Sequence, residues 1–209
     1  MGKTEEDVNP DLIEIPTVDE NNGNQEFDID GIELVEISGR SFFAKLLIIN
    51  DPSRVKLSTI YPWSDFNKSK YGETLEQLVQ RGDYAAGING GEYYSEGNWG
   101  GIPKGLVVCD GVIQYNAPQA GDVMVGFTQS NILMIADIGN MSAEQAEQFV
   151  ADNQIRDAVS FKDIDDGDNN HFTKLIINGT SREISGSGSG ANPRTVIGPV
   201  SYTHLTLPT

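Results

Sequence analysis

The stretch that decides the fold is Leu106-Val-Val-Cys-Asp-Gly-Val-Ile-Gln-Tyr115, in which two apolar runs flank Asp110-Gly111. An Asp-Gly pair between two β-type runs favours a type I′ turn, because both central residues of that turn need a positive φ. The stretch therefore predicts an antiparallel hairpin. Residues 123–127 and 132–136 predict a second hairpin directly downstream.

The rest of the chain adds more strands and only two helices. Apolar patterns typical of strands occupy residues 32–37, 41–50, 55–61, 83–88, 158–161 and 173–177. A short helix is predicted over 73–81. A second is predicted over 142–153, where Ser142 and Gln145 have capping-box spacing and Ala143, Ala146, Phe149 and Val150 form the apolar stripe. Because the helices do not alternate with strands, the predicted fold class is α+β, with a mixed, mainly antiparallel β-sheet and a few short helices.

Composition limits the classes of protein to consider. The chain has 209 residues and 38% hydrophobic residues, and these values suit one globular domain. No apolar run is long enough for a transmembrane helix. The net charge of −17 argues against a nucleic-acid partner, which needs clustered Lys and Arg. Residues 1–36 carry twelve acidic residues and one basic residue, so we expect residues 1–30 to form a disordered acidic leader. An acidic interaction tail is the alternative.

The two ends of the chain set the expected domain limits. No signal peptide is visible at the N-terminus, and the single Cys109 permits no internal disulfide. Residues Pro199–Thr209 resemble the translation of a sequencing adapter and are expected to be a non-native tail. We therefore expect one folded domain over 31–198 that is incomplete at its C-terminal end.

Three glycine-rich segments carry the candidate chemistry. In Asn89-Gly90-Gly91, paired glycines allow positive φ and a close approach of the backbone to a ligand, although an ordinary Asn-Gly turn is the alternative. In the segment 97–105, Trp99 offers a flat apolar face suited to a sugar, or else covers the core. In Asn192-Pro-Arg-Thr195, Arg194 could bind a phosphate through two hydrogen bonds, or could be a surface arginine in a turn.

Together these segments resemble a known family. The order of NGG at 89–91, GGIPKGLVVCDGVI at 100–113 and NPRTVIG at 192–198 is similar to that of the phosphodiester glycosidase family, the family of the lysosomal "uncovering enzyme". The resemblance runs from about Val35 to Gly198. It implies hydrolysis of sugar-1-phosphodiester bonds, such as those of N-acetylglucosamine-1-phosphodiesters, in envelope or exopolysaccharide polymers. It also implies an extracellular or cell-envelope location.

The resemblance assigns roles to particular residues. It implies catalytic roles for Arg194 and Asn89, and Glu92 is a local candidate for a catalytic acid. The expected substrate contacts are Gly90, Gly91, Trp99, Asn192 and Thr195. Glu92 stands where the family usually has Phe, so a solvated side chain is the alternative. The family's later aspartate segment would lie beyond Gly198, so the resemblance implies that the chain as given lacks part of its active site and is inactive. The expected ligand is a glycan or sugar phosphate, and a non-catalytic carbohydrate- or phosphate-binding module is the alternative function. The oligomeric state is left open.

One acidic segment raises the question of a metal. Asp163, Asp165 and Asp168 are spaced faintly like a calcium loop, but Lys174 stands where an EF-hand needs Glu. A solvated acidic insertion is therefore the main interpretation, and calcium is the alternative. With one cysteine and His171 as the single histidine outside the tail, the sequence predicts no zinc or iron site and no other cofactor.

Overall fold

A computed structural model describes residues 29–40, 42–59, 72–94, 102–162, 174–181 and 194–199. The chain divides into two compact units, Met1–Asp51 and Pro52–Thr209, which are described separately below. Residues 1–28 of the predicted leader and residues 200–209 of the predicted tail lie outside these ranges. In the ranges given above, no helix is long and apolar enough to cross a membrane.

The first unit contains one antiparallel hairpin. Strand β1 (Ile32–Ser38) pairs with β2 (Phe43–Ile49) along their whole lengths, from Ile32 opposite Ile49 to Ser38 opposite Phe43. Glu36 and Lys45 are directly opposite each other and form an ion pair of 3.2 Å across the hairpin. The two strands predicted in this region are confirmed.

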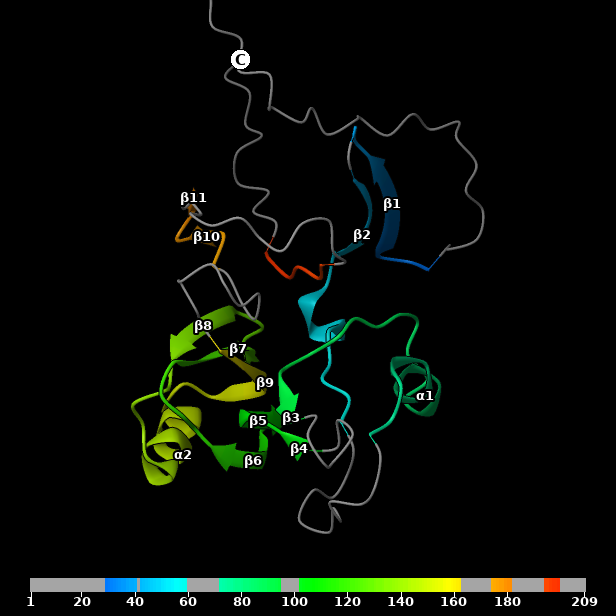
Figure 1. The fold of residues 1–209 in the computed structure, drawn as a ribbon. Coiled ribbons are helices and arrows are strands. Elements are labelled where there is room, and N and C mark those ends of the chain that lie inside the picture. The colour runs from blue at the N-terminus through cyan, green and yellow to red at the C-terminus, as the bar shows by residue number, and fades with distance from the viewer. Residues whose placement is uncertain are drawn as a thin grey trace, which may run out of the picture. The chain divides into compact units, whose positions relative to one another are not determined.

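The second unit is built on a five-stranded antiparallel sheet. Its strands are β5 (Gly105–Cys109), β6 (Val112–Ala117), β7 (Asp122–Thr128), β8 (Leu133–Asp137) and β9 (Ile155–Lys162), in the order β6-β5-β9-β7-β8 (Figure 1). Both predicted hairpins are confirmed, and Asp110 and Gly111 have the positive φ values of 49° and 76° that a type I′ turn needs. The α+β class with a mainly antiparallel sheet is also confirmed.

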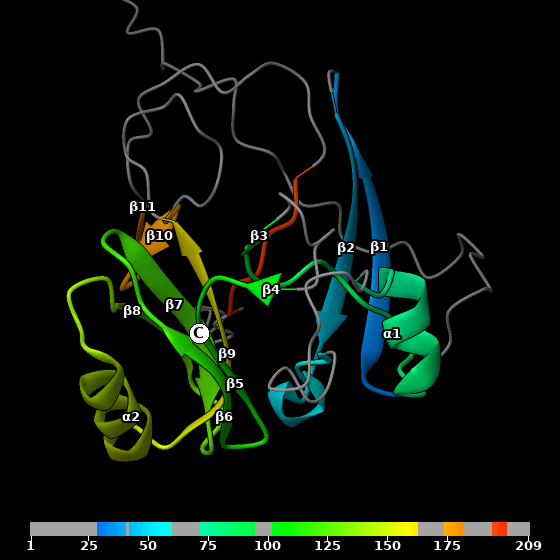
Figure 2. The ribbon, with the colours of Figure 1, turned by 60° about the horizontal axis from the view of Figure 1, so that its bottom comes forward.

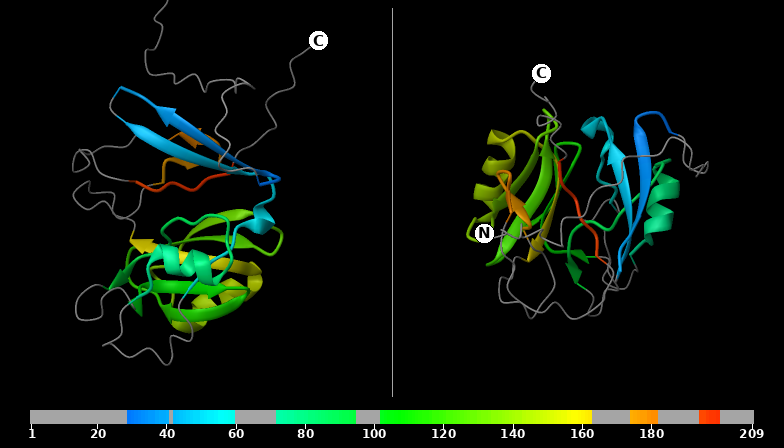
Figure 3. Two further views of the ribbon diagram at one scale, coloured as in Figure 1. Left: turned by 90° about the vertical axis from the view of Figure 1, so that its right-hand side faces the viewer. Right: turned by 90° about the horizontal axis from the view of Figure 1, so that it is seen from above.

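Helix α2 (Ala143–Asp152) covers one face of this sheet (Figures 2 and 3). Its predicted capping box is present, with the Ser142 hydroxyl and the Gln145 side chain each bonded to the other residue's backbone N–H. Ala146 and Val150 pack in a core that also contains Leu106, Val108, Met124, Ile138, Ile155 and Ala158. The side chain of Ala143, predicted to join the stripe, is exposed. Ala143 lies in the first turn and meets β6 through its carbonyl, which accepts a hydrogen bond from Asn116 Nδ2 at 2.9 Å.

The opposite face of the sheet is buried as well. Val107 and Cys109 on β5, and Val123 and Val125 on β7, alternate with the core residues and are at most 7% exposed. A strand buried on both faces reads as a continuous apolar run. This explains why these two strands have no polar residue at every second position.

A buried hydroxyl joins β9 to β5 where their pairing is short. The two strands share one ladder pair, Val108 opposite Ala158. Two residues further along β9, Ser160 Oγ accepts a hydrogen bond from Leu106 N at 2.8 Å and donates one to Leu106 O at 2.9 Å. The Ser160 hydroxyl thus bonds the Leu106 N–H and carbonyl in place of a backbone partner on β9. Ser160 is only 1% exposed.

The remaining elements are short. They are the 3₁₀ helix η1 (Pro52–Arg54), helix α1 (Leu75–Arg81), and the two-stranded pairs β3 (Tyr93–Tyr94) with β4 (Ile102–Pro103) and β10 (Ile176–Ile177) with β11 (Thr180–Ser181). Helix α1 confirms the helix predicted over 73–81, and it begins at a capping box between Thr74 and Gln77.

Two predicted strands are wrong over the residues that the structure describes. Residues 55–59 form no strand, because the carbonyls of Val55 and Leu57 accept hydrogen bonds from the Arg156 and Cys109 side chains. Residues 83–88 form no strand either. Asp83 has a φ of 52° and Tyr84 N bonds back to Val79 O, so the chain turns around the end of α1.

The Ser160 bridge gives a prediction about stability. Ser160→Ala removes both hydrogen bonds and leaves buried backbone groups of Leu106 without partners, so we expect a loss of about 2 kcal/mol in the free energy of unfolding. Urea unfolding followed by circular dichroism measures this loss. The control Ser181→Ala, at an exposed position in the same unit, should change stability by less than about 0.5 kcal/mol. Equal effects of the two substitutions would contradict the role of Ser160.

Candidate functional site

The segment with Asn89, Gly90 and Gly91 runs close against β9. A Cβ atom at position 91 would lie 2.8 Å from Val159 Cβ and 2.9 Å from Ser160 O, and both distances are too short for a side chain. A Cβ atom at position 90 would meet only ordinary contacts, of which the nearest is 3.7 Å from Val159. Neither glycine has a positive φ. Gly91 is therefore needed for space and not for backbone conformation.

This close approach places Glu92 beside the end of β9. Its N–H donates to Ser160 O at 2.9 Å, and its carbonyl accepts from Lys104 N at 2.9 Å. Its carboxylate accepts a hydrogen bond from Lys162 N at 2.8 Å through Oε1, and Oε2 lies 3.6 Å from Lys104 Nζ. The Glu92 side chain is only 13% exposed. The alternative that Glu92 is a solvated side chain is therefore wrong.

A second carboxylate belongs to the same group of charges. Asp122 lies opposite Lys162 in the β7–β9 ladder, and it is only 6% exposed. Its Oδ2 atom accepts a hydrogen bond from Gln119 N at 2.8 Å. Burial raises the pKa of Asp122, and the charge of Glu92 raises it further. The Gln119 N–H and the charges of Lys162 and Lys104 act in the opposite direction.

We call Glu92, Lys104, Asp122 and Lys162 the lysine–carboxylate cluster. The Nζ atom of Lys162 donates to Ala120 O, and the ammonium group of Lys104 lies 5.1 Å from the centre of the Tyr94 ring. The Tyr94 hydroxyl accepts a hydrogen bond from Gln119 Nε2 at 2.7 Å. A phenol and an amide thus lie next to the charged groups.

The cluster combines groups with different chemical abilities. Two ammonium groups can attract a phosphate oxygen, and Glu92 can act as a carboxylate. Asp122 is buried, and its raised pKa favours the protonated form that can donate a proton. Two carboxyl groups in unlike surroundings are typical of sites that need one acid and one base.

The structure describes six of the eight residues predicted for the site. Asn89 is exposed and directly precedes Gly90, Gly91 and Glu92 along β9. Arg194 and Thr195 are exposed in the segment 194–199, and their role beside Glu92 stays a prediction. Trp99 and Asn192 lie outside the described residues.

Sequence reasoning missed Lys104, Asp122 and Lys162. Lys104 was noticed only as part of the glycine-rich segment 97–105. Asp122 and Lys162 each lie one residue outside a strand predicted from apolar residues. Asp122 and Lys162 come together because β7 pairs with β9, which places the two residues opposite each other. Strand β8 and helix α2 lie between these two strands in the sequence, so local patterns do not reveal the pairing.

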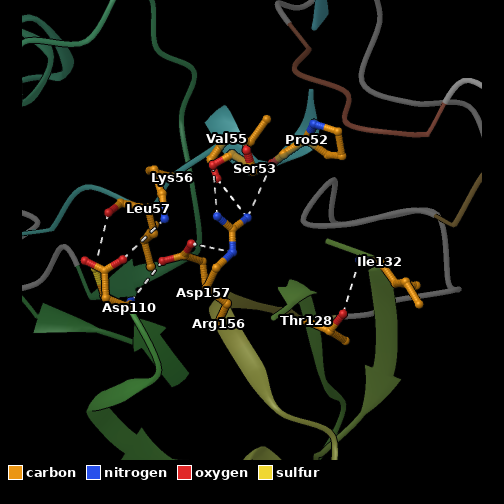
Figure 4. A network of polar contacts seen from close by, with 11 residues as sticks. Pro52, Ser53, Val55, Lys56, Leu57, Asp110, Thr128, Ile132, Arg156 and Asp157 are labelled. Atoms are coloured by element: carbon orange, nitrogen blue, oxygen red, sulfur yellow. Dashed lines mark hydrogen bonds and ion pairs between the residues drawn. The ribbon is translucent and has the colours of Figure 1, made fainter. Parts of the chain in front are cut away.

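A second charged group, at the other end of β9, has a structural role (Figure 4). The Arg156 guanidinium donates to the carbonyls of Ser53 at 3.1 Å, Val55 at 3.0 Å and Pro52 at 3.4 Å. Its Nε lies 3.4 Å from Asp157 Oδ2, while Asp157 Oδ1 accepts from Asp110 N. Because these contacts are to backbone and to a neighbouring carboxylate, Arg156 fixes the segment 52–57 against the sheet.

Among the residues described, no group of three or more His, Cys, Asp or Glu side chains is placed to hold a metal ion. The predicted calcium alternative, with Asp163, Asp165 and Asp168, falls on residues outside the described ranges.

Comparison of the chain with protein-family models, curated proteins and solved structures found no match. The resemblance to phosphodiester glycosidases therefore depends on short sequence motifs alone, which are the three glycine-rich segments together with DPSRV at 51–55 and VSF at 159–161.

The two glycines offer a matched pair of substitutions. Gly91→Ala forces a methyl group against the backbone of β9, so we expect it to destabilise the protein by about 2 kcal/mol. Gly90→Ala adds the same methyl group where there is room, and should change stability by less than about 0.5 kcal/mol. Urea unfolding of both variants tests this, and similar stabilities would show that the close approach at Gly91 is incorrect.

The raised pKa of Asp122 predicts a pH dependence of stability. The folded state holds this proton more tightly than the unfolded chain, where the pKa is about 3.9. The stabilisation from that proton is therefore present below the unfolded pKa and lost as the pH rises through the folded pKa. Asp122→Asn cannot titrate, so its stability relative to wild type should increase as the pH rises above about 4.

Urea unfolding at several pH values checks this dependence. Repeating the comparison in a Glu92→Gln background removes the charge of the second carboxylate, and the pH dependence should become weaker. A difference between Asp122→Asn and wild type that stays constant with pH would contradict the prediction.

Proposed function

We propose that this chain acts on sugar-1-phosphodiesters and hydrolyses the bond between the anomeric carbon and the phosphate. The observation that carries the proposal is the nearly buried carboxylate of Glu92, held directly behind the NGG segment between Lys104 and Lys162. The resemblance of the glycine-rich segments to phosphodiester glycosidases supports the same reaction. An N-acetylglucosamine-1-phosphodiester in an envelope or exopolysaccharide polymer is the proposed substrate, and the cell envelope or the extracellular space is the proposed location.

The proposed chemistry uses the two kinds of charge in the cluster. The phosphate is the leaving group, and Lys104, Lys162 and Arg194 would stabilise its negative charge. Glu92 would accept a proton from the attacking water or would bond to the anomeric carbon, as carboxylates do in glycoside hydrolysis. In the second case water then attacks the anomeric carbon, the bond to Glu92 breaks, and the sugar is released. The C–O bond breaks towards the phosphate, which leaves as a phosphomonoester. Asp122 would supply a proton where the leaving oxygen needs one.

A non-catalytic carbohydrate- or phosphate-binding module is the second candidate. One observation favours it. Both carboxylate oxygens of Glu92 already have partners within the protein, Lys162 N for Oε1 and Lys104 Nζ for Oε2. A carboxylate with these partners is also suited to a structural role, in which the lysines and Arg194 would bind the ligand without breaking it.

Hydrolysis of N-acetylglucosamine-1-phosphodiester distinguishes the two. We expect a version completed with a native C-terminal segment to release N-acetylglucosamine, and Glu92→Gln in that version to lower the rate by at least about 100-fold while substrate binding persists. The amide can still accept the hydrogen bond from Lys162 N, so the fold should be kept. Glu33→Gln, at an exposed position in β1, is the control and should leave the rate unchanged.

Each result has a definite meaning. Binding of the phosphodiester without release of sugar would favour the binding module. Full activity of Glu92→Gln would remove Glu92 from the chemistry. If the protein neither binds the phosphodiester nor releases sugar, both candidate functions are contradicted.

A further inference from the structure

A cavity lies away from the lysine–carboxylate cluster. It has a volume of about 400 Å³, and its lining includes Ser58, Thr59, Arg81, Tyr84, Cys109 and Asp110. None of the four residues of the cluster lines it. Its volume is within the range of cavities that bind small molecules, about 300 to 1,000 Å³.

The walls of this cavity are held by contacts that do not depend on a ligand. Arg156 fixes the segment 52–57 to the sheet, and the Cys109 thiol donates to Leu57 O at 3.2 Å. Across the cavity, Arg81 Nη2 donates to Thr59 O at 2.6 Å and forms an ion pair with Glu73 at 3.0 Å. The cavity is therefore formed in advance, which lowers the entropic cost of binding.

The Thr59 hydroxyl is the feature that points to a ligand. Thr59 is 6% exposed, and its Oγ1 atom has no hydrogen-bond partner among the residues that the structure describes. A buried hydroxyl without a partner is unfavourable, and such groups are rare in folded proteins. Because Thr59 lines the cavity, a bound molecule could supply the missing partner.

The other lining groups restrict the chemistry of that molecule. The guanidinium of Arg81 donates hydrogen bonds, the carboxylate of Asp110 accepts them, and the hydroxyl of Ser58 does both. The Asp110 carboxylate lies 3.5 Å from Lys56 Nζ and Arg81 forms an ion pair with Glu73, so neither charge requires a ligand ion of opposite sign. Tyr84 adds an aromatic ring that is 36% exposed. Burial raises the pKa of the Tyr84 phenol, so its hydroxyl stays protonated at neutral pH.

From these observations we propose that the cavity binds a small, neutral, polyhydroxylated molecule of the size of a monosaccharide. Its hydroxyls bond to Thr59 Oγ1, Arg81 and Asp110, and its carbon face packs on the Tyr84 ring. The ligand is bound in this site and is not converted. The proposal does not rest on the proposed hydrolysis at Glu92.

Two-dimensional ¹H–¹⁵N NMR of the full chain tests the proposal. Glucose, galactose, mannose and myo-inositol are titrated separately, with inorganic phosphate as the anionic probe. We expect at least one polyol to shift the amide signals of Thr59, Gly82 and Asp110 in a saturable way, and phosphate to leave them unchanged. No shift with any of the four polyols, or shifts with phosphate instead, would overturn the proposal.

A matched pair of variants tests the role of the hydroxyl. Thr59→Val keeps the shape of the side chain and removes one hydrogen bond to the ligand, so the polyol should bind about fivefold more weakly. The variant loses no internal partner, so it should fold and unfold at the same or a higher urea concentration. Thr180→Val, at an exposed position in β11, should bind as wild type does.

Two further results would overturn the proposal. Unchanged affinity of Thr59→Val would remove the hydroxyl from the site. Polyol-induced shifts confined to the residues around Glu92 would mean that the polyol binds at the lysine–carboxylate cluster and not in this cavity.

Discussion

The arrangement of this protein depends on the two hydrogen bonds between Ser160 and the backbone of Leu106. They hold β5 to β9 beyond the single ladder pair that the two strands share. The backbone carbonyl of Ser160 accepts a hydrogen bond from the Glu92 N–H. One position on β9 therefore connects the centre of the sheet to the lysine–carboxylate cluster. A change in the spacing of β5 and β9 would also move Glu92.

The two groups of charges beside β9 solve the same physical problem differently. A buried charge is unfavourable unless it has partners. Arg156 finds them in three backbone carbonyls and in Asp157, and the result is a fixed segment with little left for a ligand. In the lysine–carboxylate cluster, Lys104 keeps 34% of its side chain exposed and lies beside Tyr94. This partial exposure makes the cluster the better candidate for binding.

Much of the fold could be predicted because its signals are local. The Asp110-Gly111 turn, the β7–β8 hairpin and the capping box of Ser142 each depend on residues close together in the sequence. The failures involve contacts over longer distances. Residues 55–59 have strand-like composition, but the Arg156 side chain, about 100 positions away, takes up part of their backbone bonding.

In the candidate site, too, local signals could be predicted and long-range contacts could not. Glu92 could be found because it follows two glycines, while its partners Lys104, Asp122 and Lys162 come from three other segments. The sequence marks Gly91 as part of the motif but does not show why glycine is needed there. The sequence suggested backbone freedom, whereas the structure requires the absence of a side chain.

The order of strands in the sheet has a consequence for the route of folding. The hairpins β5–β6 and β7–β8 each join neighbours in the sequence, and such hairpins form in about 1 to 10 μs. Strand β9 follows both and inserts between them, with contacts such as Ser160 to Leu106 that span 54 positions. Contacts of long span form slowly because a large loop must close first. The insertion of β9 should therefore be the late step, and until it occurs each hairpin has an unpaired edge.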